Sequence, residues 1–403
     1  MKIVHVTTSN KGGGAAIAAI RHSEALRRKG YESVVLSGKG EVQDGSRALG
    51  YGRILRYCNA FLFYFIKGLK KKGITWNLLL FGKSIIKVKE VAEADVVILH
   101  YINEFLNYKS IAELLSSGKR VVWYMHDMWP LTGGCHHSLD CDGYTRGCEQ
   151  CPQLSHCKWL ATWQFRQKKK MFLRKNLIVA SPSKWLAEHL YKSTLFKNSE
   201  IHICPNVLDT DVFKPLVKEE ARKILKLEMT KKYILFGAAS MSSIYKGLSY
   251  VYDILIKLPS EYKFIVLGNL ATDDIPPQIL DRIHIMGFVN EDEKKRIVYS
   301  AADVFLITSI AENYPNMVVE SMACGTPVAG FAIGGIVEQI EDRVSGCLAQ
   351  VGDTDALVSG IEWLIQSNVN GEISQKAREF VQSTCSYDKV EKLYAPLLQL
   401  YTK

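Results

Sequence analysis

Short runs of β-branched and other apolar residues alternate along the chain with segments in which apolar residues recur at helical spacing. This alternation is typical of βαβ units that build a parallel sheet. In the first half we expect strands at Ile3–Val6, Ser33–Leu36, Asp95–His100, Arg120–Met125 and Leu177–Ala180. In the second half we expect them at Tyr233–Phe236, Phe264–Leu267, His284–Gly287, Val304–Thr308, Pro327–Phe331 and Cys347–Val351. The pattern predicts an α/β protein with two doubly wound domains.

The length of 403 residues also indicates more than one domain, since roughly 150 residues is usual for one. A strand-like run meets Pro205 and Asn206 near His202–Asp209, and this is the predicted seam. We expect an N-terminal domain over 1–206, a C-terminal domain over 207–386, and a helix over 387–403 that packs back on the first domain. Ligands of parallel sheets bind at the carboxyl ends of strands, so the cleft between two such domains is the expected site.

Composition places the chain among globular proteins, with 47% hydrophobic and 23% charged residues. Its charge is uneven: residues 1–200 hold 31 Lys and Arg against 15 Asp and Glu, a net of +16, whereas the rest hold 20 against 26, a net of −6. Ten cysteines are too few for a disulfide scaffold. Because no targeting segment is recognisable, we expect a cytoplasmic protein.

A basic and aromatic stretch stands out within the first half. No acidic residue falls between Asp44 and Glu90, and the apolar run Tyr57–Ile66 is flanked by Arg56 and Lys67. Ten residues are too few to cross a bilayer. The pattern suits a segment that lies on the anionic inner face of the plasma membrane. A buried aromatic helix with a solvated lysine tail is the alternative.

Three strand-end segments have residues suited to a phosphorylated ligand. Gly12, Gly13 and Gly14 follow the first strand and precede a helix, where backbone N–H groups favour an anion; a flexible turn is the alternative. Lys246 follows the strand Tyr233–Phe236 and could clamp a phosphate or be an ordinary surface lysine. The third segment, which runs from Glu312 to Glu320, contains Pro315 at a predicted helix start over about 315–324.

That third segment places a carboxylate on either side of a helix start. Glu312 falls in the loop, Glu320 lies one to two turns into the helix, and the amides of Asn316, Met317 and Val318 are expected to point outward. Such a set could hold a nucleotide diphosphate sugar, with phosphate in the middle and hydroxyls at either end. A capping acid with a solvated glutamate is the alternative.

The motifs, taken in their order along the sequence, resemble those of family 4 retaining glycosyltransferases of the GT-B fold, in which two Rossmann-like domains face a cleft. The resemblance is carried by Glu-x7-Glu with its flanking segments 302–305, 322–328 and 334–338, together with the glycine-rich loop, His126-Asp127, 205–209, Lys246-Gly247 and 287–289. It extends over essentially the whole chain. With the cysteine-rich loop at 132–157, the chain resembles the bacterial surface-polysaccharide type.

The resemblance implies roles for individual residues. Glu320 would hold the ribose hydroxyls and Glu312 the sugar hydroxyls, while Lys246 and the amides of Met317 and Val318 stabilise the diphosphate. Gly13 and Gly14 would approach it from the first domain, and His126 would bond the donor sugar or the acceptor. Ser240, Phe288 and Asn316 complete the expected donor-binding set. No catalytic metal is implied, and the anomeric configuration is retained by front-face attack.

The sequence departs from the family at one position. In the family an arginine usually stands a few residues before the lysine, but residues 239–242 here are Ala-Ser-Met-Ser. Either another cation such as Lys11 substitutes, or helix N-termini hold more of the diphosphate. UDP is expected over GDP as the nucleotide, on family frequency, and the acceptor is expected to be a glycan or a lipid-linked oligosaccharide.

Five of the ten cysteines fall within 23 residues, and Cys148 and Cys151 have the spacing of a zinc knuckle. With Cys135 and Cys141 they would complete four thiolates, so we expect a structural zinc ion. His156 or Cys157 could replace one ligand. A set of free cysteines or an iron–sulfur cluster is the alternative.

Two other functions stay open. Another GT-B enzyme, a sugar-nucleotide hydrolase or epimerase, would share the donor motifs. A nucleic-acid-binding protein would use the basic half, but its cations are not interleaved with a recognisable module, and we expect no nucleic-acid partner.

Overall fold

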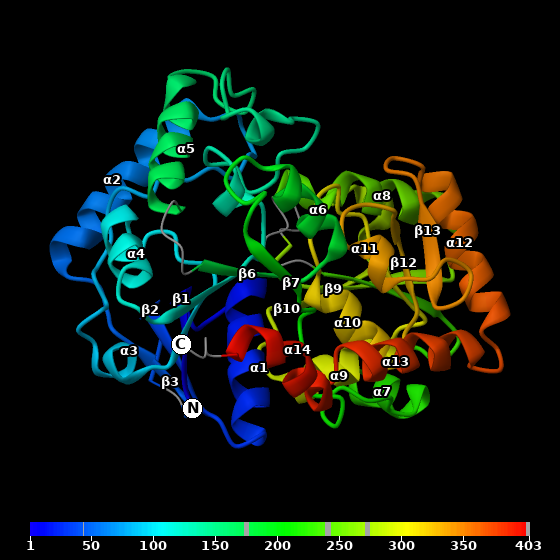
Figure 1. The fold of residues 1–403 in the computed structure, drawn as a ribbon. Helices are drawn as coiled ribbons and strands as arrows, with labels where there is room; N and C mark the ends of the chain where they lie inside the picture. The colour runs from blue at the N-terminus through cyan, green and yellow to red at the C-terminus, as the bar shows by residue number, and fades with distance from the viewer. Residues whose placement is uncertain (43, 173–176, 238–242, 271–274, 400–403) are drawn as a thin grey trace. The chain divides into compact units, whose positions relative to one another are not determined.

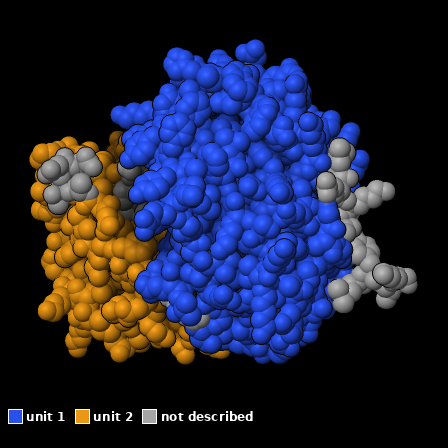
Figure 2. Space-filling model, turned by 90° about the vertical axis from the view of Figure 1, so that its left-hand side faces the viewer, with its two compact units in different colours: residues 1–207, 390–403 blue, residues 208–389 orange. Residues whose placement is uncertain are grey.

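The computed structural model describes residues 1–42, 44–172, 177–237, 243–270 and 275–399. The chain divides into two compact units, coloured separately in Figure 2. Unit 1 comprises Met1–Val207 and Val390–Lys403, and unit 2 comprises Leu208–Lys389. Unit 1 therefore extends one residue beyond the predicted boundary, and the last helix of the chain is part of it.

Unit 1 is built on a parallel sheet of seven strands in the order β3-β2-β1-β4-β5-β6-β7 (Figure 1). Its strands are β1 (Lys2–Ser9), β2 (Glu32–Lys39), β3 (Ser46–Ala48), β4 (Val96–Leu99), β5 (Arg120–Tyr124), β6 (Leu177–Ser181) and β7 (Glu200–Ile203). Its helices are α1 (Gly14–Arg28), α2 (Arg53–Leu69), α3 (Lys89–Glu93), α4 (Tyr108–Leu115), α5 (Trp159–Phe172), α6 (Lys184–Lys192) and α14 (Val390–Leu398), with 3-10 turns η1 (Trp129–Leu131) and η2 (Gly143–Thr145).

Unit 2 repeats the architecture with six parallel strands in the order β10-β9-β8-β11-β12-β13. Its strands are β8 (Lys232–Gly237), β9 (Tyr262–Leu267), β10 (Ile283–Gly287), β11 (Val304–Ile307), β12 (Val328–Phe331) and β13 (Gly346–Ala349). Its helices are α7 (Lys218–Ile224), α8 (Leu248–Lys257), α9 (Asp292–Ala301), α10 (Asn316–Ala323), α11 (Ile336–Gln339), α12 (Thr354–Ser367) and α13 (Glu372–Thr384), with 3-10 turns η3 (Ile244–Lys246), η5 (Pro277–Arg282) and η6 (Tyr387–Lys389).

All eleven expected strands are present, with ends shifted by at most three residues. The central strands β4, β5, β11 and β12 are buried along their whole length, because helices cover both faces of a doubly wound sheet. Two short strands were not predicted. β3 and β7 lie at the two edges of the first sheet, where few side chains are buried and the apolar pattern is weak.

The C-terminal helix α14 packs within unit 1, where Figure 1 shows it in red beside α1 in blue. Arg120 of β5 donates hydrogen bonds to the carbonyls of Leu397, at 2.6 Å, and Pro396, at 2.8 Å. The chain thus returns to unit 1 after forming unit 2, and α14 is hydrogen-bonded to a strand of the first sheet.

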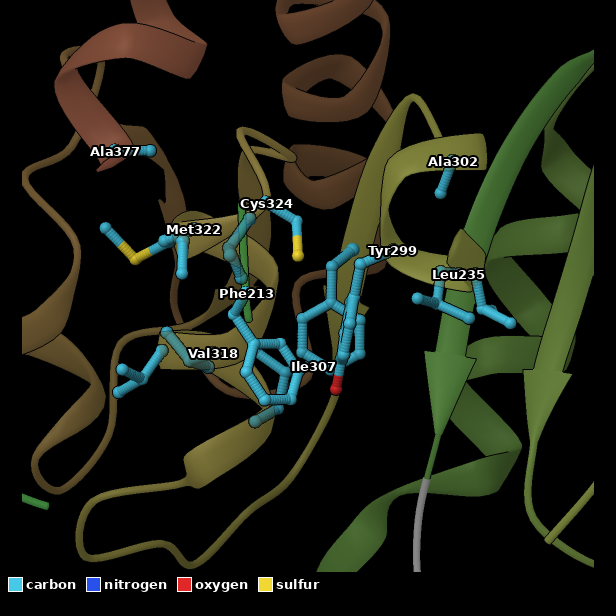
Figure 3. Close-up of a cluster of buried hydrophobic side chains, with 14 of the residues drawn as sticks. Phe213, Leu235, Tyr299, Ala302, Ile307, Val318, Met322, Cys324 and Ala377 are labelled. Atoms are coloured by element: carbon cyan, nitrogen blue, oxygen red, sulfur yellow. The ribbon is translucent and has the colours of Figure 1, made fainter. Parts of the chain in front are cut away.

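The core of unit 2 lies on both faces of its sheet. On one face, Val318 and Met322 of α10 are buried together with Phe213 and Tyr299 (Figure 3). This packing fixes α10 against the sheet, and with it the helix start that the sequence singles out.

Candidate active site

In unit 2, Lys246 and Glu312 meet at the carboxyl edge of the sheet. Lys246 ends η3, which follows β8, and Glu312 lies in the loop after the neighbouring strand β11. The lysine Nζ is 2.5 Å from Glu312 Oε1, and Ser309 Oγ donates to the same oxygen at 3.0 Å. Both side chains keep some exposure, 31% and 13%. The pair can therefore offer a cation and a carboxylate to a ligand.

Backbone geometry explains why the loops that hold this pair contain glycines. Gly247 has φ 64°, and a Cβ there would lie 2.2 Å from the Thr308 carbonyl oxygen. Thr308 Oγ1 donates to the carbonyls of Lys246 and Gly247, both at 3.0 Å. Gly334 has φ 52°, and a Cβ there would lie 1.8 Å from the Glu312 carbonyl oxygen. A side chain at either glycine would displace the loop that carries Lys246 or Glu312.

The start of α10 lies just beyond Glu312 along the chain, with Pro315 at the N-cap position. Asn316 and Met317 are half-buried in its first turn. Met317 packs on the end of β8, where a Cβ on Gly237 would lie 2.3 Å from its Cε. The prediction that three amides point outward is wrong for Val318. Its N–H donates to the Pro315 carbonyl at 3.3 Å, in a tight first turn.

Glu320 lies on the inner side of α10 and is only 3% exposed. Tyr299 of α9 donates to its Oε2 at 2.8 Å. Tyr299 is itself fully buried, and its place in the core is visible in Figure 3. Glu320 is thus a buried, hydrogen-bonded carboxylate and not a solvated one, which removes the alternative of a solvated surface glutamate.

Other members of the expected donor set are more scattered. Phe288 directly follows β10, the edge strand of the second sheet, and is half exposed. Ser240 falls outside the described residues. Lys11, considered as a substitute cation, forms an ion pair with Glu41 on the surface of unit 1.

In unit 1 the glycine-rich loop and His126 both lie at the carboxyl ends of strands of the sheet. Gly12 and Gly13 have φ 66° and 80°, and a Cβ on either would meet nothing within 4 Å. These positions need glycine for the backbone conformation, and they leave open space above the first turn of α1. His126 follows β5 and is hydrogen-bonded through Nε2 to Nδ1 of His100, which follows β4, at 2.8 Å.

Four cysteines of the loop gather at one place in unit 1. Cys135, Cys141, Cys148 and Cys151 all line a cavity of about 20 Å³. Gly133 N–H donates to Cys148 Sγ at 3.0 Å. Burial raises the pKa of Cys148 to about 12 and also raises those of Cys135 and Cys151. Among the described residues, no group of three or more His, Cys, Asp and Glu side chains is already arranged as a metal site.

Helix α2 exposes most of its apolar side chains. Leu62 and Ile66 are its buried residues. Ile54, Tyr57, Phe61 and Tyr64 are 69% to 81% exposed. This excludes the alternative of a buried aromatic helix. None of the helices in the described ranges is long and apolar enough to cross a bilayer.

Sequence reasoning missed four polar residues. Ser309 and Tyr299 bind the two glutamates, His100 binds His126, and Lys168 of α5 is fully buried beside the cysteine loop. One signal was available for His100: it is the last residue of the predicted strand Asp95–His100, and His126 directly follows another predicted strand. Tyr299 and Lys168 lie in helices, and nothing in their spacing separates them from ordinary core or surface residues.

Two family profiles match the chain in sequence. The profile described as "Glycosyltransferase Family 4" matches residues 12–212, and "Glycosyl transferases group 1" matches residues 231–367. A D-inositol 3-phosphate glycosyltransferase of Mycobacterium marinum is 28% identical over 190 residues, which cover 45% of this chain. That match spans only 40% of the relative's own length. Escherichia coli WcaC, named for colanic acid biosynthesis, is 23% identical over 79% of this chain and 80% of its own.

Solved structures agree on the fold. Sucrose-phosphate synthase from Thermosynechococcus elongatus superposes with a TM-score of 0.67 at 17% identity, covering 98% of this chain and 97% of its own. Anabaena HepE, solved with UDP-glucose, gives 0.66 at 15% identity and covers 99% of both chains. The two profiles together cover most of both units, and these neighbours share the same architecture. The chain therefore belongs to glycosyltransferase family 4 and has the GT-B fold.

Proposed function

We propose that the protein is a retaining glycosyltransferase that moves a sugar from a nucleotide diphosphate sugar to a hydroxyl of a glycan or lipid-linked oligosaccharide in polysaccharide biosynthesis. The observation that carries the proposal is the Lys246–Glu312 contact beside the start of α10. A cation, a carboxylate and a helix N-terminus at one strand edge suit a diphosphate joined to a polyhydroxylated sugar. UDP is the nucleotide we favour, as in the HepE complex with UDP-glucose.

In the proposed reaction, the acceptor oxygen forms a bond to the anomeric carbon while the bond from that carbon to the diphosphate oxygen breaks. Attack comes from the face of the leaving group, so the configuration is retained, and the acceptor proton passes to the departing phosphate. Lys246 and the Met317 amide stabilise the charge that builds on the diphosphate. Glu312 orients the sugar hydroxyls, and no catalytic metal takes part.

The remaining expected roles stay proposals. Glu320, which is 3% exposed, would hold the ribose hydroxyls. Asn316, Ser240 and Phe288 would line the donor site. Val318 is fully buried and its N–H is engaged with Pro315, so its contribution would be packing beneath the site. In unit 1, Gly13 and Gly14 would approach the diphosphate, and His126 would bond the sugar or the acceptor.

The test is a panel of UDP- and GDP-sugars, each measured for protection against thermal unfolding. We expect one UDP-sugar to raise the Tm and to be consumed when an acceptor is added. A glycosidic product supports transfer, whereas free sugar or an epimerised nucleotide identifies a hydrolase or an epimerase. Salt-sensitive oligonucleotide binding without any effect of sugar nucleotides would instead favour the nucleic-acid function.

We also propose a structural zinc ion at the four cysteines. Two observations support it besides the shared cavity. Backbone N–H groups donate to Cys148 and Cys141 sulfurs. Lys168 is a fully buried amine; burial lowers its pKa to about 7, and Cys148 and Cys135 act in the opposite direction, favouring its cationic form. A four-thiolate zinc carries negative charge, which such a cation would balance. Binding would displace the thiol protons and draw the sulfurs inward around the cavity.

Membrane association is the third proposal. The exposed stripe of α2 formed by Ile54, Tyr57, Phe61 and Tyr64 offers apolar contact, and Arg53, Arg56 and Lys67 lie in the same helix. This combination suits the interface of an anionic bilayer. A lipid-linked acceptor would be met at that surface.

A further inference from the structure

Three histidines from neighbouring strands form a continuous hydrogen-bonded chain in unit 1. His5 lies in β1, His100 directly follows β4, and His126 closely follows β5. These strands are adjacent in the sheet. His5 Nδ1 is 2.9 Å from His100 Nε2, and His100 Nδ1 is 2.8 Å from His126 Nε2. Successive rings stack with their centroids 5.1 Å apart.

Aromatic side chains enclose His5 and His100, the inner part of this histidine chain. Tyr394 of α14 packs on His5 and on His22 of α1, His22 packs on His100, and Tyr124 of β5 stacks on His100. Burial lowers the pKa of His5 to about 3 and that of His126 to about 4, and the pKa of His100 is also well below 6.5. At neutral pH each ring is therefore uncharged and has one N–H donor and one acceptor nitrogen.

The buried end of the histidine chain, at His5, determines the direction of the hydrogen bonds between the three rings. His5 Nε2 is buried and has no hydrogen-bond partner among the described residues. A buried N–H without an acceptor is costlier and rarer than a bare lone pair without a donor. The hydrogen of His5 is thus on Nδ1, which donates to His100 Nε2. His100 must then hold its hydrogen on Nδ1 and donate to His126 Nε2.

We propose that His5 and His100 are positioning residues that hold His126 as the neutral tautomer with its hydrogen on Nδ1. His126 then meets its substrate as a hydrogen-bond donor to an oxygen of the sugar, phosphate or acceptor, and it is neither a general base nor a cation. This role rests on the proposed function, because that function places His126 against substrate. The tautomer itself is a property of the unliganded protein.

The neighbouring carboxylate does not compete for this role. Asp127 is adjacent to His126 in sequence, but its Oδ2 pairs with His136 Nδ1 at 2.7 Å and its Oδ1 accepts from the Trp129 N–H at 2.8 Å. Asp127 is therefore already engaged away from the histidine chain. The nitrogen that defines the His126 tautomer is Nε2, and its partner is His100.

The direct test is a long-range ¹H–¹⁵N correlation spectrum of the unliganded full chain, labelled with ¹⁵N at histidine, at pH 7.5. We expect His126 to have a protonated Nδ1 and a bare Nε2, the reverse of the tautomer that neutral histidine prefers in water. A proton on Nε2, or on both nitrogens, would overturn the proposal. Since no substrate is present, that result would leave glycosyl transfer untouched.

Variants at His100 link the tautomer to turnover. In His100→Phe we expect the His126 hydrogen to move to Nε2 and kcat to fall about three- to tenfold, the value of one net hydrogen bond. In His100→Asn the side-chain amide can replace Nδ1 as the donor, so the tautomer and most of kcat should return. His22→Phe is the matched control, packed in the same cluster but outside the chain, and should lower the Tm without changing the tautomer. Equal losses of kcat in the Phe and Asn variants, with the tautomer unchanged in both, would contradict the assignment.

Discussion

Lys246 and Glu312 are 66 residues apart in the sequence, yet their side chains meet at 2.5 Å because β8 and β11 are neighbours in the second sheet. Without ligand, each charge compensates the other. A diphosphate would compete with Glu312 for the lysine, and a sugar would offer hydroxyls to the carboxylate. The ion pair therefore keeps both groups ordered at the place where the donor is proposed to bind.

Replacing the lysine tests this arrangement. We expect Lys246→Ala to reduce turnover by about 10²- to 10³-fold, because it removes the side-chain cation that stabilises the leaving group. Lys263→Ala is the matched control: Lys263 also forms an ion pair, with Glu228 at 2.7 Å, but it lies near the start of β9 and not at the carboxyl edge. Steady-state rates decide the matter, and equal rates for Lys246→Ala and wild type would refute the role.

Gly334 gives an independent test of how the Glu312 loop is held. Gly334→Ala should lower the free energy of unfolding by about 1–3 kcal/mol through backbone strain. It should also weaken donor binding, since the new Cβ would collide with the Glu312 carbonyl. Gly371→Ala shares a positive φ, 73°, but its Cβ would meet nothing within 4 Å. Urea titration and donor-induced shifts in Tm separate the two effects; equal donor affinity in both variants would argue against the loop contact.

Most of the fold was predictable, because the buried strands of a doubly wound sheet appear in the sequence as short runs of apolar residues. The strand-end positions of Lys246, Glu312 and His126 followed from the same pattern. The contacts between them did not, since the order of strands in the sheet decides that β8 lies beside β11 and β4 beside β5. Glu320 points inward because Tyr299, in another helix, binds its carboxylate. The hydrogen bond of the Val318 N–H belongs to the tight first turn of α10, which residue spacing does not predict.

The buried histidines should make the protein sensitive to acid. His5 and His126 have pKa values of about 3 and about 4 in the folded state, because burial disfavours the charged rings, against 6.5 ordinarily. The unfolded chain therefore binds more protons. Above pH 6.5 these histidines are neutral in both states, and the free energy of unfolding keeps its full value. As pH falls from 6.5 toward 4, the free energy of unfolding decreases by up to about 1.4 kcal/mol per pH unit for each histidine. Urea unfolding at pH 7.5 and pH 5 measures this loss of stability. Burial also holds the pKa of His22 well below 6.5, so the His22→Phe variant should lose less stability than the wild type. Equal free energies of unfolding at the two pH values in the wild type would contradict the prediction.

Metal analysis tests the cysteine site. We expect the purified protein to contain about one zinc per chain. Cys148→Ser should lose the metal and lower the Tm, because its sulfur faces the shared cavity. Cys157→Ser is the control, since Cys157 is exposed and does not line that cavity. Wild-type protein without zinc, purified in the absence of chelators, would end the proposal.

Vesicle binding tests the exposed face of α2. The protein should co-sediment with phosphatidylglycerol vesicles and be released by salt, because its cations meet anionic headgroups. A Phe61→Ser, Tyr64→Ser double variant should bind less while keeping its activity on a soluble acceptor. Val369→Ser, at an exposed apolar residue of unit 2, is the control. No binding by the wild type even at low salt would remove the membrane proposal.

The proposed reaction is transfer of a sugar from a nucleotide diphosphate donor with retention of configuration. The most direct measurement is the NMR spectrum of the product formed from an α-linked UDP-sugar and a glycan acceptor. We expect a new glycoside with an α-anomeric signal and one UDP released for each bond formed. A β-linked product would contradict retention, and release of free sugar without any glycoside would contradict transfer itself.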